Sequence, residues 1–170
     1  NPVFFKAAEA LYKMEPTAKS ARAMGILSIQ RDSYEKATNY LKEAIEMEVD
    51  PLKNADNHYK LAQVYFERGM LGSAKAEAVK AARKQSGWGD PYVLMAQVYA
   101  AGDGPKCGSN VFEKKAVYWA AIDKLRYAKS IDSSVSGKAN RLISSYKEQL
   151  PDKSVIFQLS VKEGDTYTIG

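Results

Sequence analysis

Apolar side chains recur every three or four positions along most of the chain, which is the spacing of an amphipathic α-helix. Between these stretches stand proline, glycine and aspartate, which favour turns and helix ends. The pattern predicts helices over residues 2–15, 17–30, 33–48, 55–68, 71–84, 90–101, 111–130 and 135–149.

Local signals set the expected ends of several helices. Thr17 is a good N-cap for the second helix, and Asp90 followed by Pro91 suits the start of the sixth. Asp32 and Ser33 predict a tight turn. Asp50 should end the helix 33–48, since a residue before proline avoids helical geometry.

The period changes near the end of the chain. Val155, Phe157, Leu159 and Val161 alternate with other residues, as in a β-strand, and Gly164 lies in the turn before a second short strand. A two-stranded hairpin is marginal alone in water. We therefore expect it to pack on the last helix or to continue into further sequence.

Small residues repeat at a fixed spacing within the helices. A first small residue is followed by others 12 and 19 positions later, in the sets Gly25, Ala37, Ala44 and Ala62, Ala74, Ala81; a third set, Ala96, Ala121, Ala128, is interrupted by residues 101–110. Such residues let paired helices approach closely, and repeated pairs predict a solenoid, an architecture that usually binds other molecules.

These sets resemble the 34-residue unit of the tetratricopeptide repeat (TPR) family, whose signature reads in the clearest unit as His58, Leu61, Ala62, Tyr65, Gly69, Ala74, Ala78 and Ala81. The resemblance implies an all-α fold, a right-handed α-solenoid of antiparallel helix pairs. Helical repeats would fill residues 1–150, with a half repeat at 2–15, pairs at 17–48, 55–84 and 90–131 (insertion at 101–112), and a terminal helix at 135–149. An incomplete β-hairpin tail would occupy 151–170.

The combination of TPR-like helices and a β tail resembles the C-terminal part of bacterial TPR proteins of the Gram-negative cell envelope. That resemblance favours the cell envelope or periplasm over the cytoplasm as the location. It says nothing about the oligomeric state.

In TPR solenoids the first helix of each pair lines a concave groove. By this resemblance the partner-binding residues are Arg22, Ile26, Ile29, Tyr59, Gln63, Phe66, Val93, Gln97, Asn140 and Ser144. Apolar anchors mixed with amides suit an extended peptide. The same polar residues are equally compatible with an ordinary solvated surface.

One known type of TPR ligand is not expected. TPR domains that clamp the C-terminal carboxylate of chaperones use Lys, Asn and Arg side chains at set groove positions. Here Ile26 and Lys60 stand where Asn is expected. Asp90 stands in place of Lys and Leu94 in place of Arg, so Arg22 alone keeps the expected charge.

Composition narrows the alternatives further. The 170 residues suffice for one domain, and no apolar run reaches the roughly 18 residues of a membrane span. The net charge of +5 is dispersed, so nucleic acid is not an expected partner, although an RNA-binding helical repeat stays a third hypothesis on charge alone. The single Cys107 allows no internal disulfide.

No constellation of catalytic residues emerges. The glycines at 102, 104 and 108 fit neither a dinucleotide fingerprint nor a P-loop, and the single histidine, His58, occupies a core packing position. One Cys and one His cannot form a conventional zinc site. We expect no enzyme activity, cofactor or metal.

Two hypotheses about function lead. The first is a scaffold that binds a protein or peptide in the groove. The second is an assembly module of a larger envelope protein that acts through the β tail.

Overall fold

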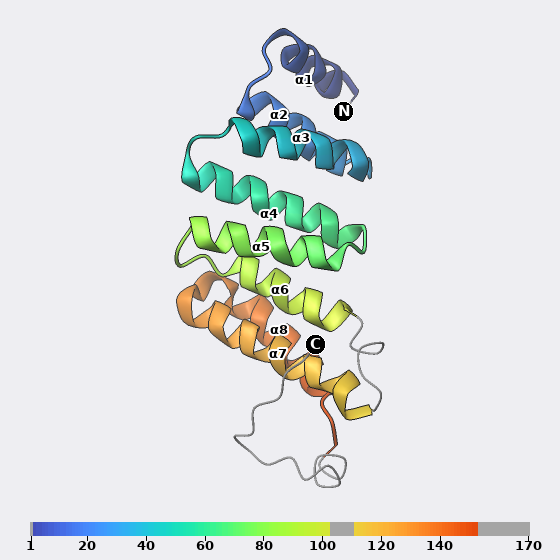
Figure 1. Cartoon of the computed structure of the whole chain (residues 1–170), viewed down its shortest axis with the longest axis vertical. Coiled ribbons are helices and arrows are strands. Elements are labelled where there is room, and N and C mark those ends of the chain that lie inside the picture. The colour runs from blue at the N-terminus through green and yellow to red at the C-terminus, as the bar shows by residue number, and fades with distance from the viewer. Residues whose placement is uncertain (1, 103–110, 153–170) are drawn as a thin grey trace. The chain divides into compact units, whose positions relative to one another are not determined.

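The computed structural model describes residues 2–102 and 111–152, which form helices joined by short connections (Figure 1). The helices are α1 (Pro2–Met14), α2 (Ala18–Ile29), α3 (Tyr34–Met47), α4 (Pro51–Glu67), α5 (Leu71–Lys84), α6 (Asp90–Ala101), α7 (Val111–Ile131) and α8 (Ser136–Lys147). A short 3₁₀ turn, η1 (Ser133–Val135), precedes α8. The all-α fold expected from the sequence is confirmed for these residues, and the predicted hairpin lies outside them.

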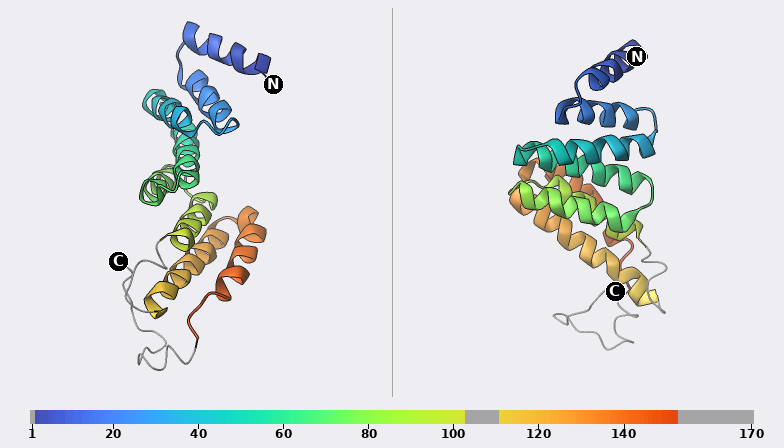
Figure 2. Two further views of the ribbon diagram at one scale, coloured as in Figure 1. Left: turned by 90° about the vertical axis from the view of Figure 1, so that its right-hand side faces the viewer. Right: turned by 45° about the horizontal axis from the view of Figure 1, so that its top comes forward.

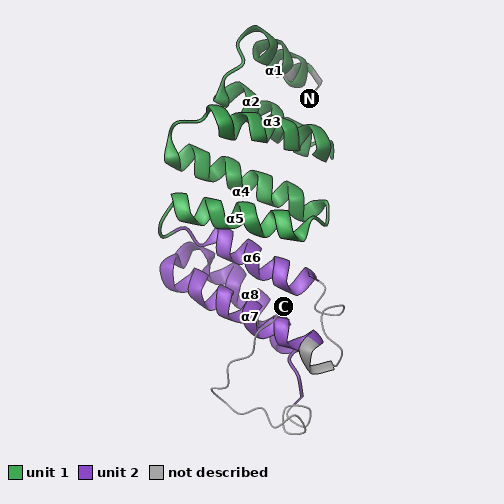
Figure 3. Ribbon diagram, viewed as in Figure 1, with its two compact units in different colours: residues 1–87 green, residues 88–170 purple. Residues whose placement is uncertain are grey.

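The chain divides into two compact units, residues 1–87 and 88–170 (Figure 3). The first contains α1 to α5 and the second α6 to α8. The strongest packing joins consecutive helices, α2 with α3 and α4 with α5 in the first unit, and α6 with α7 in the second. Each of these is a helical pair of the kind that the small residues predicted.

Buried alanines lie between the packed helices of the first unit. A set of them is completely buried at the positions named by the repeat: Ala21, Ala37, Ala44, Ala62, Ala74, Ala78 and Ala81. The left view of Figure 2 shows that α2 and α4 lie on one side of this unit, with α3 and α5 on the other. Because a methyl group takes little room, the paired helices can pack closely. Helices α2 and α4 lie on the same face of the unit.

The cap of α2 follows the sequence, whereas α4 begins earlier than expected. Thr17 accepts a hydrogen bond from the Ser20 amide in a capping box. Asp50 also acts as an N-cap, so α4 starts at Pro51 instead of residue 55. The Asp50 carboxylate accepts hydrogen bonds from the backbone amides of Leu52 and Lys53. The sequence pattern places both residues between the helices 33–48 and 55–68.

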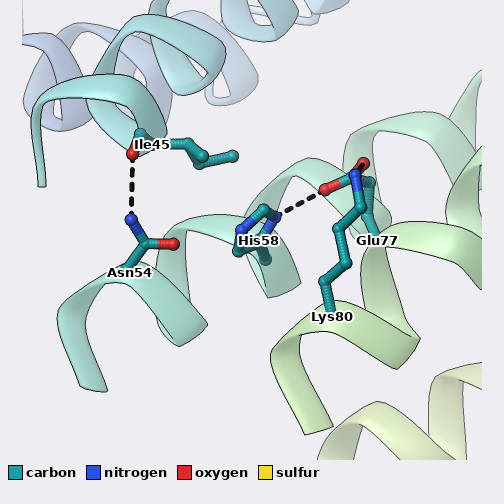
Figure 4. A network of polar contacts seen from close by, with 5 residues as sticks. All are labelled: Ile45, Asn54, His58, Glu77 and Lys80. Carbon is teal, nitrogen blue, oxygen red and sulfur yellow. Dashed lines mark hydrogen bonds and ion pairs between the residues drawn. The ribbon is translucent and has the colours of Figure 1, made fainter. Parts of the chain in front are cut away.

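Asn54 joins α3 to α4. Its side-chain amide donates to the carbonyl oxygens of Ile45 and Glu48, each at 2.9 Å (Figure 4 shows the first of these bonds). Both carbonyls lie at the C-terminal end of α3, where a helix leaves its carbonyl groups without partners. The bond therefore satisfies α3 while fixing α4 against it.

Aromatic contacts hold α1 on the next pair. The Tyr12 ring meets the Tyr40 ring edge-on, with centroids 5.1 Å apart, and its hydroxyl donates to Glu43. That hydrogen bond, with burial and the charge of Glu43, raises the pKa of Tyr12 to about 12. Arg31 lies 3.8 Å from the centre of the Phe5 ring, a cation–π contact.

The second unit has its own core, formed by Val93, Ala96, Ala121, Leu125, Ala128, Val135 and Ala139. Helix α6 enters it through Gly89, whose amide donates to Asp132 at 2.9 Å. The expectation that Asp90 would cap α6 is wrong, because α6 begins at Asp90 itself. The Asp90 carboxylate accepts from the Trp88 indole instead, at 3.1 Å.

Candidate functional site

The shared face of α2 and α4 in the first unit carries two surface cavities. The Ile26 pocket, about 390 Å³, is lined by Ile26, Ile29, Gln30, Asp32, Tyr34, Lys60, Gln63, Val64 and Glu67. The Arg22 pocket, about 530 Å³, is lined by Lys19, Arg22, Glu48, Leu52, Lys53 and Asp56. Helices α2 and α4 make few direct contacts with each other, so side chains from both can line these cavities.

Helical spacing places the two cavities at opposite ends of this face. Lys19 and Arg22 come from the first turns of α2, whereas Ile26 and Ile29 come from its second half. On α4 the order is the same, with Lys53 and Asp56 at the start and Lys60 to Glu67 at the end. Residues three, four and seven apart lie on one face of a helix, so both helices contribute one side each.

The Ile26 pocket combines an apolar floor with several polar side chains. Val64 is buried beside the partly exposed Ile26 and Ile29. Among the described residues, no hydrogen bond or ion pair engages the side chains of Gln30, Lys60, Gln63 or Glu67. Such a surface can bury an apolar side chain of a ligand and still hydrogen-bond to it.

The outer rim of the Ile26 pocket is acidic. Asp32 stands in the turn before α3 with a positive φ of 55°, and the Tyr34 hydroxyl donates to its carboxylate at 3.1 Å. This hydrogen bond raises the pKa of Tyr34, and the negative charges of Asp32 and Glu67 raise it further. The phenol therefore stays neutral, and both carboxylates lie close enough to act on it.

In the Arg22 pocket, by contrast, several charges are already engaged. Arg22 forms an ion pair with Asp56, which links α2 to α4. Glu48 accepts a hydrogen bond from the Asp50 amide at 3.1 Å, and Lys53 lies 3.8 Å from the Asp50 carboxylate. A ligand at this cavity would have to compete with these contacts, so the Ile26 pocket is the better candidate site.

The predicted groove residues fall into three groups. Ile26, Ile29 and Gln63 line the Ile26 pocket, and Arg22 lines the other cavity. Tyr59, which is only 8% exposed, and the half-buried Phe66 line neither of the two. The remaining predicted residues, Val93, Gln97, Asn140 and Ser144, belong to the second unit.

Within the second unit, the prediction that Val93 binds a partner is wrong. It is completely buried in the core with Leu125 and Val135, so it presents no surface to a partner. Gln97 is half-buried. Asn140 and Ser144 are exposed on α8, and the Asn140 side chain accepts a hydrogen bond from Lys129 at 2.6 Å.

Beyond the predicted partner-binding residues, the Ile26 pocket is lined by Gln30, Asp32, Tyr34, Lys60, Val64 and Glu67. Lys60 and Val64 could have been found, because Lys60 stands three residues before Gln63 and four before Val64 on the same helix. Asp32 and Tyr34 could not, since they come from a turn and the next helix, which reach the pocket only in the folded unit.

Other kinds of site find no support in the part of the chain that the structure describes. Over residues 2–102 and 111–152, no three His, Cys, Asp or Glu side chains come together as metal ligands would. No helix in the same ranges has the length and apolar character needed to cross a membrane. Cys107 lies outside the described residues.

The chain was compared with known proteins. No family model matches it, and no curated protein sequence matches it. Solved structures do. The TPR2B domain of yeast Sti1, in a complex with pHsp70, has a TM-score of 0.63 and 19% identity over 78% of this chain and 97% of that one.

Two further structures are similar. The TPR domain of Arabidopsis OM64 has a TM-score of 0.60 and 16% identity over 77% of this chain and 94% of the other. MamA has a TM-score of 0.54 and 17% identity over 85% of each chain. At these identities the likeness concerns the fold alone. Together with the buried small residues of the paired helices, it identifies the architecture of this chain as that of a tetratricopeptide-repeat domain.

Proposed function

We propose that this chain is a protein-interaction scaffold that binds an extended peptide segment of a partner on the α2/α4 face. The observation that carries the proposal is the Ile26 pocket, where an apolar floor lies beside four polar side chains that have no hydrogen bond or ion pair with a described residue, Gln30, Lys60, Gln63 and Glu67. The fold supports the same function, since one of the similar TPR structures is a complex with a protein partner.

The geometry suits a peptide more than a compact ligand. From Lys19 to Gln30 the α2 side of the two cavities extends over about 16 Å, at roughly 1.5 Å per helical residue. An extended peptide covers this length with about five residues, at roughly 3.3 Å each. Ile26, Ile29 and Val64 would receive an apolar anchor, while Gln63 would hydrogen-bond to the peptide backbone.

The test begins with peptides selected against the whole chain from a random display library. Binding of each selected peptide is then measured to Ile26→Asn and to Val49→Asn. Val49 is 95% exposed and lines neither cavity, so its variant is a matched control for the loss of a surface aliphatic side chain. Circular dichroism verifies that both variants remain folded.

We expect Ile26→Asn to weaken binding at least about tenfold, because the loss of a buried aliphatic anchor costs more than about 1.4 kcal/mol. Val49→Asn should bind like the original chain. The proposal is wrong if selection yields no binder, or if the selected peptides bind Ile26→Asn as tightly as the original chain.

A further inference from the structure

The charges of the Ile26 pocket are ordered along α4. Lys60 stands at the inner end, towards the Arg22 pocket, and Glu67 stands at the outer end, with Asp32 on the same acidic rim. Seven residues separate Lys60 from Glu67, which corresponds to about 10 Å along the helix. Between them lies the apolar floor.

These charges are available to a ligand. Neither Lys60 nor Glu67 takes part in an ion pair with a described residue, whereas Arg22 and Asp56 in the neighbouring cavity neutralise each other. Lys60 is half-buried, so solvent screens it less than a fully exposed lysine. Opposite charges on a bound segment would therefore gain partners without breaking an existing pair.

On this basis we infer that the pocket recognises a segment with an acidic side chain, an apolar side chain and a basic side chain in that order. The acidic group pairs with Lys60, the apolar group fills the floor at Ile26, Ile29 and Val64, and the Lys or Arg pairs with Glu67 and Asp32. This inference rests on the proposed peptide-binding function and adds the chemistry of the ligand to it.

The spacing of the charges follows from the geometry. An extended chain advances about 3.3 Å per residue, and only alternate side chains point to the same side, so residues two and four positions after the first can face the pocket together with it. Acidic and basic residues should therefore stand four positions apart, about 13 Å, with the apolar residue midway between them, and the flexible side chains at both ends take up the difference from the roughly 10 Å along α4. Backbone direction is left free, because the lining amides can donate to and accept from either orientation.

Three synthetic peptides test this order. One carries Glu-Ala-Leu-Ala-Lys between serines; a second replaces the Lys by Glu, and a third replaces the Glu by Lys. Each is titrated by NMR against the original chain, against Lys60→Glu and against the double variant Asp32→Asn with Glu67→Lys. Asn suits position 32 because it tolerates a positive φ. Lys42→Glu, exposed on α3 and outside the pocket, controls for net charge.

We expect the original chain and Lys42→Glu to prefer the peptide with both charges by about 3- to 10-fold over either of the others. Lys60→Glu should prefer the peptide with two lysines, and the double variant the peptide with two glutamates. The preferences should decline with added salt.

Each other outcome decides against the inference. If the three peptides bind the original chain equally and Ile26→Asn weakens all of them, the groove is correct and the charge order is wrong. If none of the three binds, or if Lys60→Glu keeps the original preference, the inferred ligand chemistry is wrong, and the library selection still judges the proposed function by itself.

Discussion

Gly25 of α2 lies directly against Leu41 of α3. A Cβ atom on Gly25 would stand 2.8 Å from the Cγ of Leu41 and 3.0 Å from its Cδ2, closer than side chains approach one another. Leu41 is itself completely buried, so it has no free space into which it could move. The packing of α2 against α3 therefore requires a residue without a side chain at position 25.

Gly25→Val should consequently destabilise the first unit by about 1–3 kcal/mol, because it inserts three carbon atoms into a filled core. Gly72→Val makes the same change on α5 where nothing lies within 4 Å of the added Cβ, and it should stay within about 0.5 kcal/mol of the original chain. Urea unfolding followed by circular dichroism measures both. Equal stability of the two variants would contradict the close contact.

The same argument applies to the small residues of the other pairs. Ala62 and Ala96 are completely buried, in the first and second unit respectively. Ala62→Leu or Ala96→Leu should each cost about 1–3 kcal/mol through overpacking. Ala76→Leu, on the exposed face of α5, is the control and should change stability little. Thermal melting that is unchanged in both core variants would overturn the register of the repeats.

The sequence predicted these packing residues well because a steric requirement leaves a direct mark on residue size. Gly25 and Ala62 must be small whatever else the chain does. Position in a repeat carries less information about exposure. Val93 corresponds to a groove position, yet η1 and α8 add Val135 and Ala139 to the cluster in which it is buried.

Features made by several elements together could not be predicted from the local pattern. The sequence pattern does not predict the start of α4 at Pro51. Asp50 before a proline indicates the end of the preceding helix, whereas in the structure the Asp50 side chain also caps α4. The acidic rim of the Ile26 pocket joins a turn residue, Asp32, to the end of α4. His58 was correctly placed in the core, but its partner Glu77 is on another helix.

Gly89 provides a prediction specific to the second unit. An added Cβ would lie 2.7 Å from a Val135 methyl, 2.9 Å from the Asp132 Cβ and 3.1 Å from the Ala128 carbonyl oxygen. Gly89→Ala should therefore lower the stability of this unit by about 1–3 kcal/mol. Gly137→Ala, whose new methyl would meet a single Arg141 atom at 3.9 Å, is the matched control and should be neutral or slightly stabilising.

Hydrogen exchange of the backbone amides locates the effect. In Gly89→Ala, amides of α6 and α7 should exchange faster than in the control. Faster exchange confined to the first unit, or none, would contradict the packing role assigned to Gly89.

The contact between His58 and Glu77 predicts a dependence of stability on pH. The Nδ1–H of His58 donates to a Glu77 carboxylate oxygen at 2.6 Å, and Lys80 donates to the other oxygen at 2.7 Å (Figure 4). Burial by itself would raise the pKa of Glu77, but these hydrogen bonds and the adjoining positive charges outweigh burial and lower it.

Because the pKa of Glu77 is lower in the folded chain than its ordinary value of 4.5, its carboxylate stabilises the fold above about pH 4.5. This contribution is lost as the pH falls through the lowered pKa. Glu77→Gln should cost about 1–3 kcal/mol near neutral pH, since it weakens two charge-assisted bonds, and the difference from the original chain should shrink in acid. Glu46→Gln, exposed on α3, should differ little at either pH. Urea unfolding at both pH values decides; a cost for Glu77→Gln that stays the same in acid would show that the pair acts through packing and not through charge.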